Sequence, residues 1–233
     1  MKFGGAAVLS SVDVAAEAGA ITGLIGPNGA GKTTLFNCIT GLLQPSSGVV
    51  LLDGDDIGSL PPFKRARRGV ARTFQRLELF TSLTVRDNVR VAGDIRNRWG
   101  RGKSDAQQEC DRVLELLGIA HLAERDVTDI PTGMARRVEL ARALMSRPKI
   151  LLLDEPASGQ DEHETREFGE LLVELCAKGT AILLVEHDVS LVMDVCSYIH
   201  VLDFGRIIAT GTPAEIQANE SVLSAYLGQE QPS

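Results

Sequence analysis

A glycine-rich segment, GPNGAGKTT at Gly26–Thr34, has the residue types and the spacing of a phosphate-binding loop. Glycines let successive backbone N–H groups curl around an anion, and a helix that begins directly after them adds its positive N-terminal end. Lys32 would supply a positive charge to the β- and γ-phosphates, and Thr33 a hydroxyl to Mg²⁺. The alternative is a flexible glycine turn, but an apolar strand before the loop and helical spacing after it favour the phosphate site. The residues expected to contact nucleotide here are Gly26, Pro27, Asn28, Gly29, Ala30, Gly31, Lys32, Thr33 and Thr34.

An apolar strand that ends in two carboxylates, ILLLDEP at 150–156, supplies the second part of such a site. Ligands of open α/β folds bind at the carboxyl ends of the strands, where these carboxylates would lie. Asp154 would hold Mg²⁺ through water, and Glu155 would polarise an attacking water as a general base. Alone, an Asp-Glu pair after a strand is usually a solvated turn. The phosphate-binding loop in the same chain favours the catalytic interpretation.

Two further polar residues follow predicted strands. Gln75 ends the segment GVARTFQ and would reach the metal or the attacking water, while His187 follows the apolar run AILLVE. A lone Gln is usually a surface residue, and a lone His after a buried strand usually packs through a hydrogen bond. Both become catalytic candidates only as members of a set with Asp154 and Glu155.

Short apolar strands that alternate with helices predict a largely parallel sheet covered on both faces. Strands are expected at 21–25, 46–57 (short, closing in an Asp-Gly turn), 69–75, 149–156 and 180–188, and a hairpin at 198–211 that turns at Phe204–Arg206. Helices are expected at 34–43, 110–119, 162–178 and 191–196, and from 212, where Thr212 would be the N-cap and Glu215 the N3 residue of a capping box. The region 84–146 is predicted to be largely helical apart from a polar loop at 94–104. An apolar stripe of Val138, Ala141 and Met145 predicts an intact helix after residue 134.

The composition argues against a nucleic-acid partner. Net charge is −7 over 233 residues and aromatic residues make up 4%, so a general phosphate-backbone binder and a base-stacking surface are both disfavoured. A local basic cluster, Lys64, Arg65, Arg67 and Arg68, is predicted to be a solvated helix face rather than a binding patch.

The four cysteines, Cys38, Cys110, Cys176 and Cys196, form no CxxC pair and are predicted to be free, buried thiols in a reducing compartment. The sequence contains neither an apolar run of about 18 residues nor the apolar segment of a signal peptide at its start. If the protein works at a membrane, we expect another chain to anchor it.

Nearly the whole chain resembles the ATP-binding subunit of ABC transporters. The resemblance is carried, in this order, by Gly26–Thr33, Gln75, IPTGMARRVELARAL, LLLDEP, Asp161 and His187. The segments LFNCITGLLQPSSG, DEPASGQD, VEHDVSLVMDVC and VLDFGRIIATGTPAEI are most similar to the ATPases of branched-chain amino acid importers, with urea and amide relatives close behind. The resemblance implies an α/β fold: a P-loop NTPase core with a mainly parallel sheet, a small antiparallel β portion and an inserted helical subdomain. It predicts a single ABC ATPase domain over 1–233, with the core at about 1–84 and 147–233 and the helical subdomain at about 85–146.

The resemblance also implies roles for individual residues. ATP and Mg²⁺ would lie between two head-to-tail subunits, which are either identical or different, with Glu155, His187 and Gln75 as catalytic residues. His187 would contact the γ-phosphate, Gln75 would couple the nucleotide to the permease, and Asp161 would cross the subunit interface. The metal would be held by Thr33, Gln75 and Asp154, and Phe3 would stack on adenine. Because the chain begins two residues ahead of Phe3, we expect this end to fray.

The signature turn departs from the family pattern. Aligned without gaps, the usual L-S-G-G-Q becomes Ile130–Met134, and the residues expected to contact the partner's nucleotide are Thr132, Gly133 and Met134. Gly133 permits close approach to phosphate, whereas Pro131 has no N–H to donate and Thr132 brings a hydroxyl that would compensate. Three interpretations stay open: a functional but altered site, a site impaired in hydrolysis, and a turn that only packs.

The sequence therefore predicts an ATP-hydrolysing importer subunit at the cytoplasmic face of the membrane. Its transmembrane permease subunits would be moved by closure and reopening of the ATPase dimer, and a solute-binding protein would be an indirect partner. One alternative is a nucleotide-binding subunit with impaired hydrolysis. Another is a soluble ABC ATPase that acts on nucleic acid or ribosomes, which would predict tandem domains or a strongly basic surface. A P-loop kinase would not explain the signature helix or His187.

Overall fold

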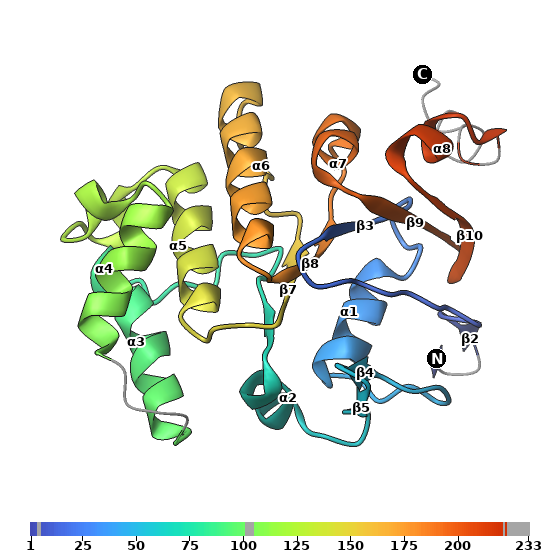
Figure 1. The fold of residues 1–233 in the computed structure, drawn as a ribbon, viewed down its shortest axis with the longest axis horizontal. Helices are drawn as coiled ribbons and strands as arrows, with labels where there is room; N and C mark the ends of the chain where they lie inside the picture. The colour runs from blue at the N-terminus through green and yellow to red at the C-terminus, as the bar shows by residue number, and fades with distance from the viewer. Residues whose placement is uncertain (4–5, 101–104, 221, 223–233) are drawn as a thin grey trace.

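The structure, a computed structural model, describes residues 1–3, 6–100, 105–220 and 222 (Figure 1). Its main sheet has six strands in the order β10-β9-β3-β8-β7-β6. They are β3 (Ile21–Ile25), β6 (Val70–Arg72), β7 (Ile150–Asp154), β8 (Ala181–Val185), β9 (Tyr198–Asp203) and β10 (Arg206–Gly211). Every neighbouring pair is parallel except β9 and β10, which form the predicted hairpin. The predicted mainly parallel α/β sheet is confirmed.

The two faces of this sheet pack against different helices. Alternate strand residues such as Leu24, Leu152 and Leu183 share a hydrophobic cluster with Phe36 of α1 (Lys32–Thr40). The intervening residues, such as Leu151 and Ile182, pack instead with α6 (Glu162–Ala177) and α7 (Val189–Val195). Figure 1 shows α1 on one side of the sheet and α6 and α7 on the other. This two-sided burial explains why the central strand β8, AILLV, is apolar at every position.

Three helices gather at one end of the molecule (Figure 1): α3 (Val85–Arg98), α4 (Ala106–Leu116) and α5 (Thr132–Leu144). The 3-10 turns Ala120–Leu122 and Val127–Asp129 connect α4 to α5. Val138, Ala141 and Met145 are completely buried, as the predicted stripe requires. The division of the chain into core and helical subdomain at 84/85 and 146/147 stays a prediction.

The loop predicted at 94–104 is wrong for residues 94–98, which continue α3. The prediction failed because it treated Arg96 as a polar loop residue, whereas the Arg96 side chain is buried. It donates to the carbonyl of Met145 at 2.7 Å and pairs with Glu109 at 2.5 Å, so α3 packs against its neighbours through a polar residue. Residues 101–104 of the predicted loop lie outside the described residues.

Short antiparallel pairs and short helices complete the core. β1 (Lys2–Phe3) pairs with β2 (Ala6–Ala7), and β4 (Leu51–Leu52) pairs with β5 (Asp55–Asp56) through the predicted Asp-Gly turn. Helix α8 (Pro213–Gln217) begins with the predicted capping box of Thr212 and Glu215. Together with the main sheet, these pairs confirm the small antiparallel portion of the fold.

Helix α2 (Pro62–Arg68) carries the basic cluster, and Arg65 departs from its prediction. Its side chain is completely buried, with Nη1 donating to the carbonyls of Cys38 at 2.6 Å and Ile39 at 2.8 Å, and Nη2 donating to that of Gly58 at 2.6 Å. The prediction of a solvated face holds for Lys64, Arg67 and Arg68, which are exposed, and is wrong for Arg65. Arg65 instead fastens α2 to the end of α1.

All four cysteines are free and buried, as predicted. None of the helices in the described part of the chain has the length and apolar character needed to cross a bilayer.

Candidate nucleotide-binding site

Four segments that the sequence marked for chemistry follow four adjacent parallel strands. The phosphate-binding loop follows β3, His187 follows β8, Glu155 follows β7, and Gln75 follows β6. Parallel strands end at one edge of a sheet, so the order of the strands brings these segments together from distant parts of the chain.

Close packing shapes the phosphate-binding loop. Gly26 has φ 157°, and a Cβ added to it would lie 2.0 Å from the carbonyl oxygen of Leu202. Gly31, the N-cap of α1, has φ 111°. The first N–H groups of α1 have no acceptor within the helix, so they are free to bind an anion.

Lys32 folds back over the loop. Its buried ammonium donates to the carbonyls of Gly26 and, at 3.2 Å, Pro27. Burial lowers the pKa of Lys32, and the charges of Glu155 and Asp154 act in the opposite direction. The influence of these carboxylates shows that the lysine shares one electrostatic environment with the end of β7.

Glu155 is held between two of its predicted catalytic partners. Its φ of 51° lies in the left-handed region, an uncommon conformation for a residue other than glycine. The side-chain Nε2 of Gln75 donates to Oε2 of Glu155 at 3.1 Å, and Nε2 of His187 lies 2.9 Å from Oε1. The structure therefore brings Gln75, Glu155 and His187 into direct contact.

Glu186 supports this arrangement and was missed from the sequence. It is buried, and its carboxylate accepts the N–H groups of Ala157 at 2.8 Å and His187 at 3.0 Å. Burial raises the pKa of Glu186 above its ordinary value, although these hydrogen bonds act against the rise. Its position between the end of β8 and the loop after Glu155 holds the two predicted catalytic segments together. The only signal in the sequence is a carboxylate at the end of an apolar strand.

Asp154 forms a buried ion pair that the sequence did not reveal. Its Oδ2 accepts a hydrogen bond from Nη2 of Arg72 at 2.8 Å, and 5–6% of each side chain is exposed. Nη1 of Arg72 donates to Oδ1 of Asn37 on α1 at 2.6 Å. Oxygen donors are the ligands that Mg²⁺ prefers, usually one or two carboxylates together with substrate phosphates. The Asp154 carboxylate and the Thr33 hydroxyl fit this requirement.

The signature turn begins α5, with Pro131 as N-cap and no side-chain cap. The backbone N–H groups of Thr132, Gly133 and Met134 therefore form its first turn and have no acceptor within the helix. Gly133 is buried beside α6, where a Cβ would lie 3.4 Å from the Glu164 carboxylate, an ordinary contact distance. Packing within the chain alone therefore does not require glycine at 133.

Asp161 lies at the start of α6, near the signature turn. It is exposed, and its side chain accepts the N–H of Glu164 at 2.8 Å as part of a capping box. Asp161 thus has a structural role within this chain in addition to the predicted one. Among the hydrogen bonds of the described residues, none joins the signature turn to the phosphate-binding loop.

Arginine side chains tie α5 to the segment that carries Gln75. Arg136, which is buried, donates to the carbonyls of Phe74 at 3.0 Å and Gln75 at 2.6 Å. Its partner Glu139 accepts the N–H of Glu78 at 2.8 Å. The position of Gln75 is therefore linked to the helix that carries the signature turn.

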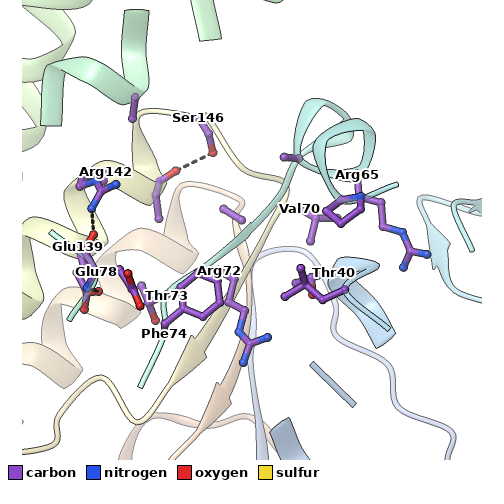
Figure 2. A pocket seen from close by; sticks show the side chains of 16 residues that line it. Thr40, Arg65, Val70, Arg72, Thr73, Phe74, Glu78, Glu139, Arg142 and Ser146 are labelled. Carbon is purple, nitrogen blue, oxygen red and sulfur yellow. Dashed lines mark hydrogen bonds between the residues drawn. The ribbon is translucent and has the colours of Figure 1, made fainter. Parts of the chain in front are cut away.

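A groove of about 340 Å³ lies beside this segment, over β6 (Figure 2). Figure 2 shows Arg65 and Thr40 at one end, Glu78, Glu139 and Arg142 at the other, and Arg72 and Phe74 between them. Phe74 precedes Gln75, so the groove adjoins the catalytic segment. The side chain of Phe3 lies outside the described residues, so its predicted stacking on adenine stays a prediction.

Comparisons with known proteins agree with this geometry. The ABC transporter family matches residues 9–158, and the family described as branched-chain amino acid ATP-binding cassette transporter matches residues 206–231. The chain is 39% identical to the high-affinity branched-chain amino acid transport ATP-binding protein BraF of Pseudomonas aeruginosa, and 40% identical to LivG of Escherichia coli, which carries the same description. Each alignment covers 98% of this chain and 95% of the relative.

A solved structure also has a similar fold. The crystal structure of a nucleotide-free ATP-binding cassette from an ABC transporter matches with a TM-score of 0.88 and 29% identity, over 98% of this chain and 96% of that one. The predicted resemblance is confirmed, and the chain belongs to the ATP-binding subunits of ABC transporters, a family of transport ATPases.

Proposed function

We propose that this chain binds and hydrolyses ATP with Mg²⁺ for an importer of branched-chain amino acids or related small polar solutes. The observation that carries the proposal is the placement of Glu155, held by Gln75 and His187, at the sheet edge that also presents the phosphate-binding loop. The solute class is inferred from the match over residues 206–231 and from the printed descriptions of BraF and LivG.

Binding would begin at Gly26–Thr34. The N–H groups of the loop and of the first turn of α1 would surround the phosphates, with Phe3 stacked on adenine. The ammonium of Lys32 would exchange its backbone carbonyls for phosphate oxygens, which are better partners for a positive charge. Mg²⁺ held by Asp154 and Thr33, with Gln75 as a further ligand, would neutralise phosphate charge.

Hydrolysis would use the carboxylate of Glu155 as the general base. Glu155 would take a proton from the attacking water while His187 donates to the γ-phosphate, and Gln75 would orient the water or the metal. The left-handed backbone at Glu155 and the two side chains beside it would fix the direction of the carboxylate before ATP arrives. Such preorganisation is a usual source of catalytic power.

A second ATPase subunit would complete the site. The signature turn would contact ATP bound to the partner subunit through the N–H groups at the start of α5, with Thr132, Gly133 and Met134 closest and Asp161 beside them. Gly133 supports this role, since packing alone does not require glycine there and a phosphate approaching closely would. Pro131 and Met134 favour, as a second candidate function, a nucleotide-binding subunit with impaired hydrolysis.

A permease would occupy the groove over β6. The groove is lined by Phe74, the residue before Gln75. Leu42 and Phe74, which both line it, expose 52% and 41% of their surface. An apolar cytoplasmic segment of a transmembrane subunit would therefore bury apolar surface here and would lie next to the segment that carries Gln75. The protein would then act peripherally at the cytoplasmic face of the membrane, with a solute-binding protein as an indirect partner.

The phosphate-binding loop is tested by Lys32→Ala with Lys64→Ala, at an exposed position of α2, as the matched control. Fluorescent ATP binding and phosphate release are measured for both proteins. Lys32→Ala should weaken ATP binding and abolish phosphate release, and Lys64→Ala should resemble the original protein. Unchanged hydrolysis by Lys32→Ala would exclude this loop as the nucleotide site.

A further inference from the structure

One buried side chain joins three parts of the nucleotide site. Arg72, the last residue of β6, directs Nη2 to Asp154 at 2.8 Å and Nη1 to Asn37 at 2.6 Å. Asn37 lies on α1, the helix that follows the phosphate-binding loop, and Asp154 ends β7. Arg72 therefore fixes the distance between the carboxylate and the helix that would hold the phosphates.

The guanidinium is itself held in one orientation. Its central carbon lies 5.3 Å from the centre of the Phe36 ring and 4.9 Å from that of Phe74. Arginine stacks on aromatic faces and presents several donors in a rigid plane, which lysine does not. With two aromatic neighbours and two oxygen acceptors, Arg72 has little freedom to follow a moving Asp154.

We propose that Arg72 is a positioning residue for the metal in the ATPase reaction: it holds Oδ2 of Asp154 and so presents Oδ1 to Mg²⁺. The inference rests on the proposed metal role of Asp154 and extends it to Arg72, which contacts Asp154 and would not contact the metal itself. Metal-ligating carboxylates are commonly oriented by such hydrogen bonds, and losing the outer partner typically costs 10–100-fold in metal affinity or activity.

The effect of losing Arg72 has a definite sign. If the arginine only competed with the metal for the carboxylate, removing it would strengthen metal binding. If it positions the carboxylate, removing it weakens metal binding, because Asp154 is then free to rotate away from the orientation that the metal needs. The geometry favours positioning, since the same guanidinium is anchored to Asn37 and lies over the rings of Phe36 and Phe74.

The test is Mn²⁺ binding to the ADP-loaded protein, followed by electron paramagnetic resonance, for Arg72→Met, Arg72→Lys and Asn37→Ala. Arg72→Met should weaken Mn²⁺ binding on the order of 10-fold. Arg72→Lys and Asn37→Ala should have smaller effects in the same direction. ADP binding measured in EDTA should be unchanged in all three. The control is Arg68→Met, which removes an exposed arginine that pairs with Asp55 at 3.0 Å.

The Asp154→Asn variant distinguishes the proposed metal role of Asp154 from the positioning role of Arg72. If Asp154→Asn binds Mn²⁺ as the original protein does, the proposed metal role of Asp154 fails. If Asp154→Asn loses Mn²⁺ while the Arg72 and Asn37 variants bind it normally or more tightly, only the positioning role of Arg72 is overturned. Circular dichroism in EDTA establishes folding, and if Arg72→Met does not fold, Arg72→Lys and Asn37→Ala decide the question alone.

Discussion

Glu155 pairs a strained backbone with a well-supported side chain. A left-handed conformation at a residue other than glycine costs of the order of 1–3 kcal/mol, and such residues tend to persist at functional sites where the surroundings determine them. Here the N–H of Glu155 donates to Val185 at 2.8 Å, and Gln75 and His187 hold the carboxylate. The strain directs the proposed base toward its two partners.

The signature turn gives a prediction at the scale of single residues. Losing one donor to a developing phosphate charge costs on the order of 100-fold in rate unless another group replaces it. Thr132 is the candidate replacement for Pro131, so Thr132→Val should slow hydrolysis further, and Met134→Gln should raise it. The measurement is single-turnover hydrolysis in mixed dimers, in which this chain also carries Lys32→Ala so that only ATP on the partner's loop is hydrolysed.

A control is built into these dimers. When the same substitution is placed in the other subunit, whose signature turn serves the disabled Lys32 site, the rate should not change. If Thr132→Val and Met134→Gln leave the rate unchanged in both arrangements, the turn only packs, and its proposed contact with nucleotide is wrong.

The sequence identified the motif residues of the proposed site but not the buried residues that hold them in position. Lys32, Glu155 and His187 were identifiable because their types and spacing follow from phosphate chemistry. Arg65 and Arg72 were not, because each is held in part by a distant residue of the chain: Ile39 lies 26 positions from Arg65, and Asp154 lies 82 positions from Arg72. A charged side chain in a sequence predicts exposure unless its distant partners are known.

At the scale of elements, α5 connects the segment that carries Gln75 with the signature turn. Arg136 and Glu139 hold the segment Phe74–Glu78, which includes Gln75, while the first turn of the same helix carries Thr132 and Gly133. A displacement of Gln75 by nucleotide would therefore act on the turn that serves the partner subunit.

The packing of α3 and α4 depends on a partly buried carboxylate, that of Glu109, and so on pH. Burial alone would raise the pKa of Glu109, but the guanidinium groups of Arg96 and Arg147 outweigh it and lower the pKa from 4.5 to about 2. A lowered pKa stabilises the fold above the unfolded value, near pH 4.5, and this contribution is lost as pH falls from there toward about 2.

Glu109→Gln should accordingly lower the free energy of unfolding at pH 7 by about 1–2 kcal/mol, because solvent screens part of this half-exposed ion-pair cluster. The difference between the two proteins should shrink below pH 4.5, and urea unfolding at pH 7, 5 and 3.5 measures it. Glu115→Gln, on the same helix, is the control. A difference that is independent of pH would show that the Glu109 charge is not the cause.

The sequence predicted most elements correctly because their signals are local. Thr212 and Glu215 predict their capping box, and the Asp-Gly turn predicted within 46–57 is present, although the strand expected there is limited to 51–52 and 55–56. The end of α3 was wrong because Arg96 pairs with residues of α4 and α5, and such pairing leaves no local pattern. The order of the strands was not predicted, because the apolar runs themselves do not show which strands lie side by side.

At the scale of the whole molecule, two surfaces lie next to each other. The proposed catalytic segments lie at the carboxyl ends of β3, β8, β7 and β6, and the groove lies against β6, the edge strand of the described sheet. A protein segment bound in the groove would contact Phe74 and would therefore affect the position of the next residue, Gln75. This arrangement suits a subunit that couples ATP hydrolysis to movement of a neighbouring protein.

Membrane attachment should therefore depend on the permease. The purified chain should leave protein-free liposomes unbound and should sediment with liposomes that contain its permease subunits. Leu42→Asp, at a groove residue with 52% exposure, should abolish this, whereas Val173→Asp on α6, with 49% exposure, should not. Equal binding to liposomes with and without permease would contradict the proposed attachment.

The central claim is that Glu155 is the base that hydrolyses ATP in the dimer. The most direct measurement is single-turnover phosphate release by Glu155→Gln, with ATP binding measured in parallel and Glu162→Gln, an exposed carboxylate on α6, as the control. The account predicts that Glu155→Gln binds ATP as the original protein does, stays dimeric with ATP bound, and releases no phosphate, while Glu162→Gln turns over normally. Phosphate release by Glu155→Gln at the original rate would contradict it.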